Sequence, residues 1–291
     1  MRTINIIGCG KVGRTLARLW TERSLLSVRG ILNRSIPSGL RAVEFVGAGR
    51  AVEDCARMER ADLVMIAAPD EAIEGCCGEL CRSGVLGQGA VVFHCSGSLS
   101  SALLEPARRC GASVASVHPV KSFADPATAV KSFAGTFCGV EGDPAACEVL
   151  GELLRGCGAV TFSIEPEFKT IYHAGSVMVC NYFVALIEAG LRCFEKAGIS
   201  RETALQVIEP IVRETVDNVF RLGPVGSLTG PIARGEPSVV GRQCEALGRW
   251  DGRIEGIYRS LGRLAVEISA LAGGADADAL AAIKELLDES P

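Results

Sequence analysis

A strand that runs directly into a glycine-rich turn constrains the fold of this chain more than any other feature. The apolar segment 3–7 is followed by the spacing Gly-x-Gly-x-x-Gly, formed by Gly8, Cys9, Gly10, Lys11, Val12 and Gly13. A helical pattern of apolar residues comes next. In such a turn the first glycine permits the tight bend, the second lets a pyrophosphate approach the backbone, and the third lets the helix pack on the strand. The segment therefore predicts a dinucleotide site with phosphates at the helix N-terminus, and a purely structural turn is the alternative.

Strand and helix patterns alternate through the first half of the 291-residue chain. Strands are expected at 3–7, 27–32, 63–68, 90–94, 114–117, 136–140 and 160–164, and helices at 70–82, 100–110 and 144–156. Residues 40–61 are consistent with a helix and a short strand. This alternation predicts an α/β fold with a Rossmann-like, doubly wound parallel sheet covered by helices on both faces.

The character of the chain changes after Glu165-Pro166, because every later pattern is helical. Helices are expected at 167–197, 200–221, 237–247, 251–271 and 276–288, with Ser200 and Asp276 as N-caps. The length suits two domains. We therefore expect a Rossmann-like NADP-binding domain at 1–165 and an all-α domain for substrate binding and dimerisation at 166–291.

Composition excludes several classes of partner and site. A net charge of −4 offers no basic surface for nucleic acid. The 13 cysteines are scattered, odd in number and mostly set in apolar runs, which indicates a reducing compartment and a cytoplasmic protein. The cluster of Cys76, Cys77 and Cys81 has no second Cys or His pair, so no metal site is expected.

One stretch, 171–191, is apolar enough to resemble a membrane span. It contains His173, Asn181 and Glu188, which are costly at bilayer depth. A buried helix or a subunit-interface helix is favoured instead, and we expect a homodimer formed through the helical domain. The N-terminus enters a strand directly, without a signal-peptide pattern.

The end of the second expected strand bears on cofactor choice. NAD sites of this type carry an acidic residue there to bind the ribose hydroxyls. This chain has Asn33, Arg34 and Ser35, which suit a 2′-phosphate better than a carboxylate would. NADP is therefore the expected cofactor, unless these residues are only a solvated polar turn. The small residues Ala67, Ala68 and Pro69 follow a strand and would let the cofactor pass close by.

Ligands of doubly wound sheets bind beyond the carboxyl ends of the strands, so residues that follow strands are candidates. His94 ends one expected strand, with Ser96 close behind, and both are candidates for contact with the cofactor; His118 ends the next strand. Histidine moves protons near neutral pH, as hydride transfer to a carbonyl or imine requires. The alternative for His94 is a strand-end residue satisfied by backbone. Asp70 is expected only to cap a helix.

Two further groups of candidates lie in the helical half. Lys169 and His173 are four residues apart, so a helix projects them from one face. The alternative is a solvated lysine and a histidine used in packing. Thr229 and Gly230 form a turn that could present a hydroxyl and backbone amides to a carboxylate, although such turns also simply join helices.

These motifs resemble a known superfamily over nearly the whole chain. The glycine turn, Asn33-Arg34, Ala67-Ala68-Pro69 and the helical second half resemble the pyrroline-5-carboxylate reductase and 6-phosphogluconate dehydrogenase superfamily. A closer resemblance is to an uncharacterised bacterial branch with a Rossmann-like domain and a C-terminal domain of unknown function, whose members are described as NADP oxidoreductases. It rests on His94-Cys95-Ser96-Gly97, Val117-His118-Pro119, Tyr172-His173-Ala174 with Asn181-Tyr182, and Leu228-Thr229-Gly230-Pro231.

The resemblance implies roles for individual residues. Lys169 matches a catalytic lysine of β-hydroxyacid dehydrogenases, where it donates a proton to the substrate oxygen, although the asparagine four residues later is His173 here. His118 matches the histidine of prephenate dehydrogenases that contacts the substrate hydroxyl. Thr229 and Gly230 are placed like the reductase loop that holds a carboxylate, and Asn181 is a further candidate for substrate binding.

The expected function is that of an NADP-dependent oxidoreductase acting on a small carboxylate-bearing ketone, imine or hydroxy acid. Lys169, His173 and His118 are the candidates for catalysis. Two alternatives stay open, a non-catalytic protein that binds NADPH and reports its level to a partner, and a reductase that uses the deazaflavin F420.

Overall fold

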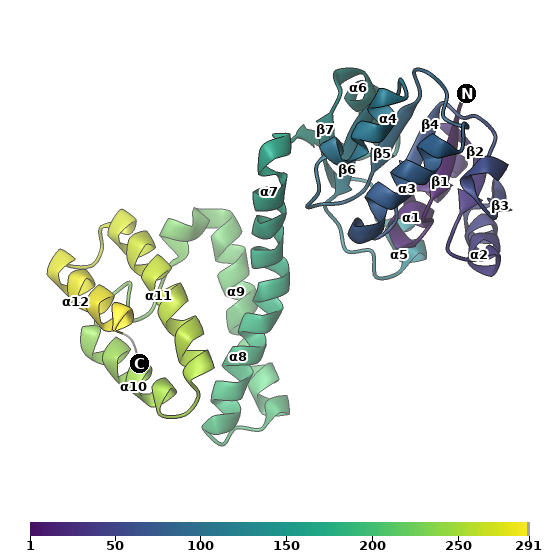
Figure 1. The fold of residues 1–291 in the computed structure, drawn as a ribbon. Helices are drawn as coiled ribbons and strands as arrows, with labels where there is room; N and C mark the ends of the chain where they lie inside the picture. The colour runs from purple at the N-terminus through teal and green to yellow at the C-terminus, as the bar shows by residue number, and fades with distance from the viewer. Residues whose placement is uncertain (290–291) are drawn as a thin grey trace. The chain divides into compact units, whose positions relative to one another are not determined.

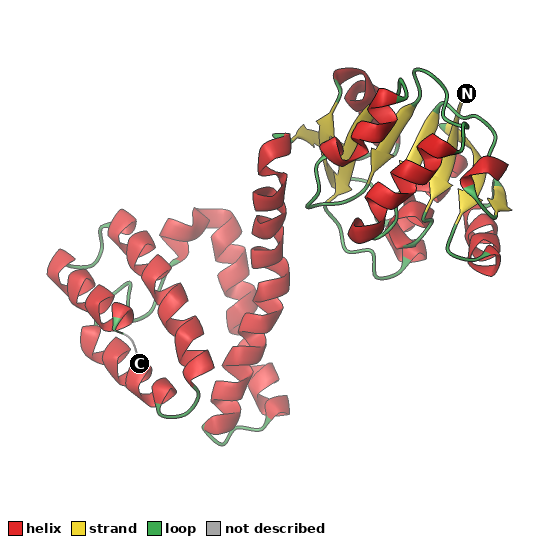
Figure 2. Cartoon of the chain, in the orientation of Figure 1, coloured by secondary structure: helices red, strands yellow, loops and turns green. Residues whose placement is uncertain are grey.

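The computed structural model describes residues 1–289 and divides into two compact units, Met1–Cys180 and a second that begins at Asn181 (Figure 1). The first unit combines strands and helices, and the second is helical (Figure 2). The sequence places the division at residue 165, after the last strand, whereas residues 166–180 group with the first unit by their contacts. Those residues begin the long apolar helix.

The first unit is built on an eight-stranded sheet with the order β3-β2-β1-β4-β5-β6-β7-β8. Its strands are β1 (Arg2–Ile7), β2 (Leu26–Leu32), β3 (Arg50–Val52), β4 (Leu63–Ile66), β5 (Val91–His94), β6 (Ser113–Pro119), β7 (Phe137–Gly142) and β8 (Val160–Ser163). Strand order reverses between β1 and β4, which is the switch point where ligands of doubly wound sheets bind. The Rossmann-like fold expected from the sequence is confirmed.

One pairing corrects the expectation of a wholly parallel sheet. Strands β6 and β7 are antiparallel, with Pro119 beside Cys138, while the other neighbours are parallel. Segment 120–136 joins β6 and β7 and contains only the short helix α5 (Pro126–Lys131). It returns to the sheet at the end where β6 stops, so β7 runs in the opposite direction to β6. The sequence of β7 shows a strand but not its direction.

Apolar side chains cover both faces of the sheet and form two cores. Helices α1 (Lys11–Glu22), α2 (Ile36–Val46) and α6 (Pro144–Gly156) pack on one face, where Trp20 and Phe93 meet edge to face. Helix α3 (Asp70–Arg82), the 3-10 turn η2 (Ser101–Leu104) and helix α4 (Glu105–Arg109) pack on the other. A further 3-10 turn, η1 (Cys55–Arg57), follows β3.

The expected helix 167–197 is interrupted. It consists of the 3-10 turn η3 (Pro166–Phe168), α7 (Lys169–Ser176), a π-helical turn η4 (Val177–Asn181) and α8 (Tyr182–Lys196). The span Pro166–Lys196 is long and apolar enough to cross a membrane by composition, and only 11% of its most apolar window is buried. The expectation of a helix buried within the chain is therefore wrong, and the subunit-interface interpretation is the one that stays as a proposal.

The rest of the second unit consists of α9 (Arg201–Ser227), α10 (Pro237–Gly248), α11 (Gly252–Ala272) and α12 (Ala277–Asp288). Ser200 and Asp276 cap their helices by accepting from Thr203 N–H and Ala279 N–H, as predicted. Helix α9 runs past the predicted end, with a break in helical geometry at Gly223. The buried core of this unit lies between α10, α11 and α12.

Candidate active site

The three glycines of the first turn differ in what surrounds them. Gly8 has a φ of +82°, and a Cβ there would lie 2.7 Å from the backbone N of Ala68. A Cβ on Gly13 would lie 3.2 Å from the Ala67 Cβ. A Cβ on Gly10 would meet nothing within 4 Å. Packing within the chain therefore accounts for the first and third glycines, while the second faces open space.

The groups around that space suit a phosphate. Gly10 is the N-cap of α1 and supplies no side-chain cap, so the first N–H groups of the helix are left for an anion. Asn33 Oδ1 accepts from Cys9 N–H at 2.6 Å, so Asn33 braces the turn itself. Arg34 and Ser35 are exposed beside it, and the Ser35 side chain makes no cap bond to α2.

A row of buried polar residues crosses the sheet near the carboxyl ends of β5 and β6. His94 pairs with Ser116 across β5 and β6, and Ser116 pairs with Glu141 across β6 and β7. Residues in register across a sheet point to the same face. His94 and Ser116 are 0% exposed and Glu141 is 3% exposed. This row interrupts an otherwise apolar sheet.

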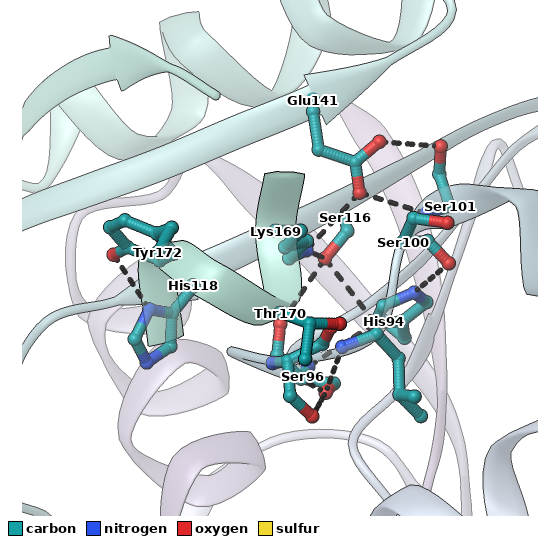
Figure 3. A network of polar contacts seen from close by, with 12 residues as sticks. His94, Ser96, Ser100, Ser101, Ser116, His118, Glu141, Lys169, Thr170 and Tyr172 are labelled. Atoms are coloured by element: carbon teal, nitrogen blue, oxygen red, sulfur yellow. Dashed lines mark hydrogen bonds and ion pairs between the residues drawn. The ribbon is translucent and has the colours of Figure 1, made fainter. Parts of the chain in front are cut away.

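Lys169, the first residue of α7, is inserted into this row (Figure 3). Its Nζ lies 3.1 Å from Glu141 Oε1 and also donates to Ser116 Oγ. The residue is 1% exposed. Burial lowers the pKa of Lys169, and the Glu141 carboxylate opposes that shift. The predicted catalytic residue Lys169 is therefore buried and closed to solvent.

Hydrogen-bond geometry defines the tautomer of His94. Its Nε2 lies 3.1 Å from the carbonyl of Ser100, which can only accept, so Nε2 carries the proton. Nδ1 is then an acceptor for Ser96 N–H at 3.2 Å and Ser116 Oγ–H at 3.3 Å. Burial, followed by the Lys169 charge, lowers the pKa of His94 to about 4. His94 is a neutral, fully bonded core residue and does not face a ligand in this arrangement.

The loop after β5 is organised by Asp70, and this corrects its expected role as a helix cap. The N-cap of α3 is Pro69, and Asp70 Oδ2 accepts from Ser96 Oγ at 2.9 Å and Ser98 Oγ at 2.8 Å. Ser96 Oγ in turn accepts from Leu99 N–H at 3.0 Å. Ser96, predicted to contact the cofactor, is 6% exposed and serves this network. The Asp70 carboxylate accepts from the hydroxyls of Ser96 and Ser98 instead of capping the helix.

Two histidine rings pack against Gly97, and Tyr172 is bonded to one of them. His118 Nδ1 lies 2.8 Å from the Tyr172 hydroxyl, and the His118 and His173 rings are edge to face with centroids 5.6 Å apart. A Cβ at Gly97 would overlap the His173 ring and lie 2.8 Å from His118 Nε2. Only glycine therefore lets the loop approach both rings. Burial, followed by the His173 and Lys169 charges, lowers the pKa of His118 to about 4.

The remaining candidates belong to the second unit. Asn181 ends the π-helical turn and is exposed. Gly230 has a φ of +92°, which explains the glycine. Thr229 lines a cavity of about 520 Å³ with mostly apolar walls, where Tyr258 donates to Gln243 at 2.6 Å.

The structure thus brings together three of the predicted residues, His118, His173 and Lys169, at one end of the sheet. Sequence reasoning missed Glu141 and the part that Tyr172 plays. The available signals were a charged residue directly after an apolar strand and a tyrosine next to a candidate histidine. Neither signal shows which partner the side chain meets, because the partners lie 28 and 54 residues away.

Comparison with protein families also divides the chain into two parts, but at an earlier position than the division between the two compact units. Residues 2–119 match the model of a Rossmann-like domain, and residues 136–265 match the domain of unknown function DUF2520. The chain pairs a Rossmann-like domain with a DUF2520 domain. This confirms the architecture that the sequence resemblance indicated. The DUF2520 match begins before β7, so the last two strands of the sheet fall within it.

Solved structures share this fold. The protein TM1727 of Thermotoga maritima is 26% identical, with a TM-score of 0.74 over 92% of this chain and 98% of that chain. A Bacteroides fragilis protein, named as a candidate NADP oxidoreductase, is 18% identical, with a TM-score of 0.69 over 92% and 98% of the two chains. A pyrroline-5-carboxylate reductase of Coxiella burnetii is 17% identical, with a TM-score of 0.56 over 98% of each chain. No curated protein sequence matches the Rossmann–DUF2520 chain.

Proposed function

We propose that the Rossmann–DUF2520 chain is an NADP-dependent oxidoreductase. The observation that carries the proposal is the open space at Gly10, where no packing within the chain requires a glycine. A nucleotide pyrophosphate requires one there, because it binds against the backbone. Similarity in fold to proteins named as NADP oxidoreductase and pyrroline-5-carboxylate reductase supports the same class.

The residues that would hold the cofactor are those of the glycine turn and the end of β2. The N–H groups of α1 would bind the pyrophosphate, and Ala67 and Ala68 border the turn. Arg34 and Ser35 would bind a 2′-phosphate, since Asn33 is already bonded to Cys9 and Ser38. When bound, the cofactor supplies or accepts the hydride.

The protein's part is to bind and orient the reacting carbonyl or imine. His118 is neutral at pH 7, so its ring offers one donor and one acceptor. When the Tyr172 hydroxyl donates to Nδ1, Nε2–H points toward Gly97 and can donate to a substrate oxygen or nitrogen. The His173 ring packs edge to face against the His118 ring.

Lys169 has a different place in this proposal from the one that the resemblance implied. Because its ammonium is enclosed by Ser116 and Glu141, it acts on the substrate through His118 and not by direct contact. Its charge adds to the effects of burial and of His173, which together lower the pKa of His118. The substrate class proposed is a small carboxylate-bearing ketone, imine or hydroxy acid, in line with the fold shared with pyrroline-5-carboxylate reductase.

A homodimer and a cytoplasmic location complete the proposal. Helix α9 spans 27 residues and buries only Ala204, although it carries Leu205, Ile211 and Phe220. Phe220 is 88% exposed. An apolar surface of this kind is typical of an interface, and a second copy is the proposed occupant. All 13 cysteines are free thiols, which suits a reducing compartment.

The proposal is tested by turnover with a panel of 2-oxo acids and cyclic imino carboxylates. NADPH consumption is followed for the wild type, for His118→Gln, and for Glu245→Gln, an exposed control on α10. We expect consumption with at least one compound, loss of about 100-fold or more in His118→Gln, and no change in the control. Equal rates in the wild type and His118→Gln would contradict the assignment of His118.

A further inference from the structure

A single buried carboxylate connects two segments that form the candidate site. Glu141 accepts three hydrogen bonds, and no sequence pattern assigned it a role. Its Oε1 accepts from Lys169 Nζ at 3.1 Å and from Ser101 N–H at 2.8 Å, and its Oε2 accepts from Ser101 Oγ at 2.7 Å (Figure 3). Each partner begins a different segment.

Through Lys169, Glu141 fixes the start of α7. Tyr172 and His173 follow Lys169 by three and four residues, so they lie one helical turn away on the same side. The next residue after Lys169 adds a second tie, because Thr170 Oγ1 donates to the carbonyl of Ser98 at 3.2 Å. The position of the Tyr172 hydroxyl therefore depends on where Lys169 is held.

Through Ser101, Glu141 fixes the far end of the loop that follows β5. Ser101 is the first residue of η2 and comes directly after residues 95–100. His94 ties both ends of the loop, because its ring binds the carbonyl of Ser100 and the N–H of Ser96. Gly97 lies between these anchors, against His118 and His173.

We propose that Glu141 is a positioning residue of the oxidoreductase site, which holds α7 and the 95–100 loop in register so that Tyr172 and Gly97 meet His118 from two sides. The inference rests on the proposed function for the importance of His118. If the Glu141 ion pair only stabilised the fold, its loss would leave the surroundings of His118 unchanged, whereas a positioning role predicts a change at His118. Glu255 provides that comparison, because it is also buried and ion-paired, to Arg259 on α11.

The test uses the full chain labelled with ¹⁵N-histidine, which contains three histidines assigned with His118→Gln and His173→Gln. The ¹⁵N shifts of the two ring nitrogens report the tautomer that His118 adopts in its bond with Tyr172. We expect widely separated shifts in the wild type. In Glu141→Gln they should move toward each other as the ring samples both tautomers. Glu255→Gln should lower Tm and leave the His118 shifts unchanged.

Glu141→Gln leaves the Lys169 charge buried without a partner and so risks unfolding. Glu141→Gln/Lys169→Met removes both charges, and we expect it to fold and to show the same His118 change. Wild-type His118 shifts in the folded double variant would overturn the proposal and leave Glu141 as a stabilising carboxylate only. Neither cofactor nor substrate takes part, so a failure of the proposed NADPH activity would be seen separately.

Discussion

The Lys169 ammonium nitrogen lies 3.1 Å from Glu141 Oε1, with both side chains closed to solvent. A buried ion pair adds little net stability compared with apolar side chains of the same size, but loss of one partner is costly. The pair also anchors the start of α7 to strand β7. We therefore expect this ion pair to act mainly by holding the start of α7 in place, and less by stabilising the fold.

Lys169→Gln should destabilise the protein strongly, because it leaves the Glu141 carboxylate buried without a cation. We expect the free energy of unfolding to fall by about 3–5 kcal/mol, measured by urea denaturation. Glu141→Gln/Lys169→Met should recover more than half of that loss. The control Arg249→Ala, from an exposed pair with Glu245, should change stability by less than about 1 kcal/mol. A loss in Lys169→Gln no larger than in the control would count against this account.

The glycine turn gives a second prediction. Gly8→Ala places a Cβ 2.7 Å from Ala68 N at a φ of +82°, so it should lower Tm or prevent folding. Gly10→Ala meets no neighbouring atom, so its Tm should lie within a few degrees of wild type. Thermal unfolding followed by circular dichroism compares the two. A Gly10→Ala protein that loses as much stability as Gly8→Ala would show that Gly10 is structural.

Acidification should destabilise the fold through His94. Its pKa is about 4 in the folded chain against an ordinary value of 6.5, so between these values the unfolded chain binds a proton that the folded chain does not. Stability is therefore full above about pH 6.5 and is lost as the pH falls toward 4, by up to about 3 kcal/mol. Urea denaturation across this range should show a shallower pH dependence in His94→Gln. Identical slopes would mean that His94 is not held neutral by burial.

Cofactor preference should depend on Arg34. A guanidinium bound to a phosphate contributes about 1.5–3 kcal/mol, so Arg34→Ala should weaken NADPH binding by about 10- to 100-fold and leave NADH binding unchanged. Arg41→Ala is the matched control, because Arg41 is also exposed and lies on helix α2, which begins two residues after Arg34. An equal loss for both cofactors would place Arg34 elsewhere than at the 2′-phosphate.

The features that the sequence predicted are those encoded locally. The glycine spacing, the helix caps at Ser200 and Asp276, and the apolar strands are each visible within a few residues. The sequence also singled out His118 at a strand end and His173 on a helix face, and their rings lie 5.6 Å apart in the structure. Their role in the site stays a prediction.

What the sequence could not show depends on register between distant segments. Glu141 reaches Lys169 only because β7 runs antiparallel to β6 and places Glu141 beside Ser116. The pairing of Tyr172 with His118 and the use of Asp70 by the loop serines have the same origin. The π-helical turn at 177–181 has no signal in the apolar pattern, since the helix continues on both sides of it.

The central claim is that the space at Gly10 is a binding site for NADP. Calorimetric titration of NADPH into the full-length wild type and Gly10→Ala tests it most directly. The account predicts saturable one-site binding to the wild type and at least a 100-fold weaker affinity in Gly10→Ala at unchanged Tm, since the added methyl group occupies the pyrophosphate position. No binding of NADPH to the folded wild type, or equal affinity in the two proteins, would contradict it.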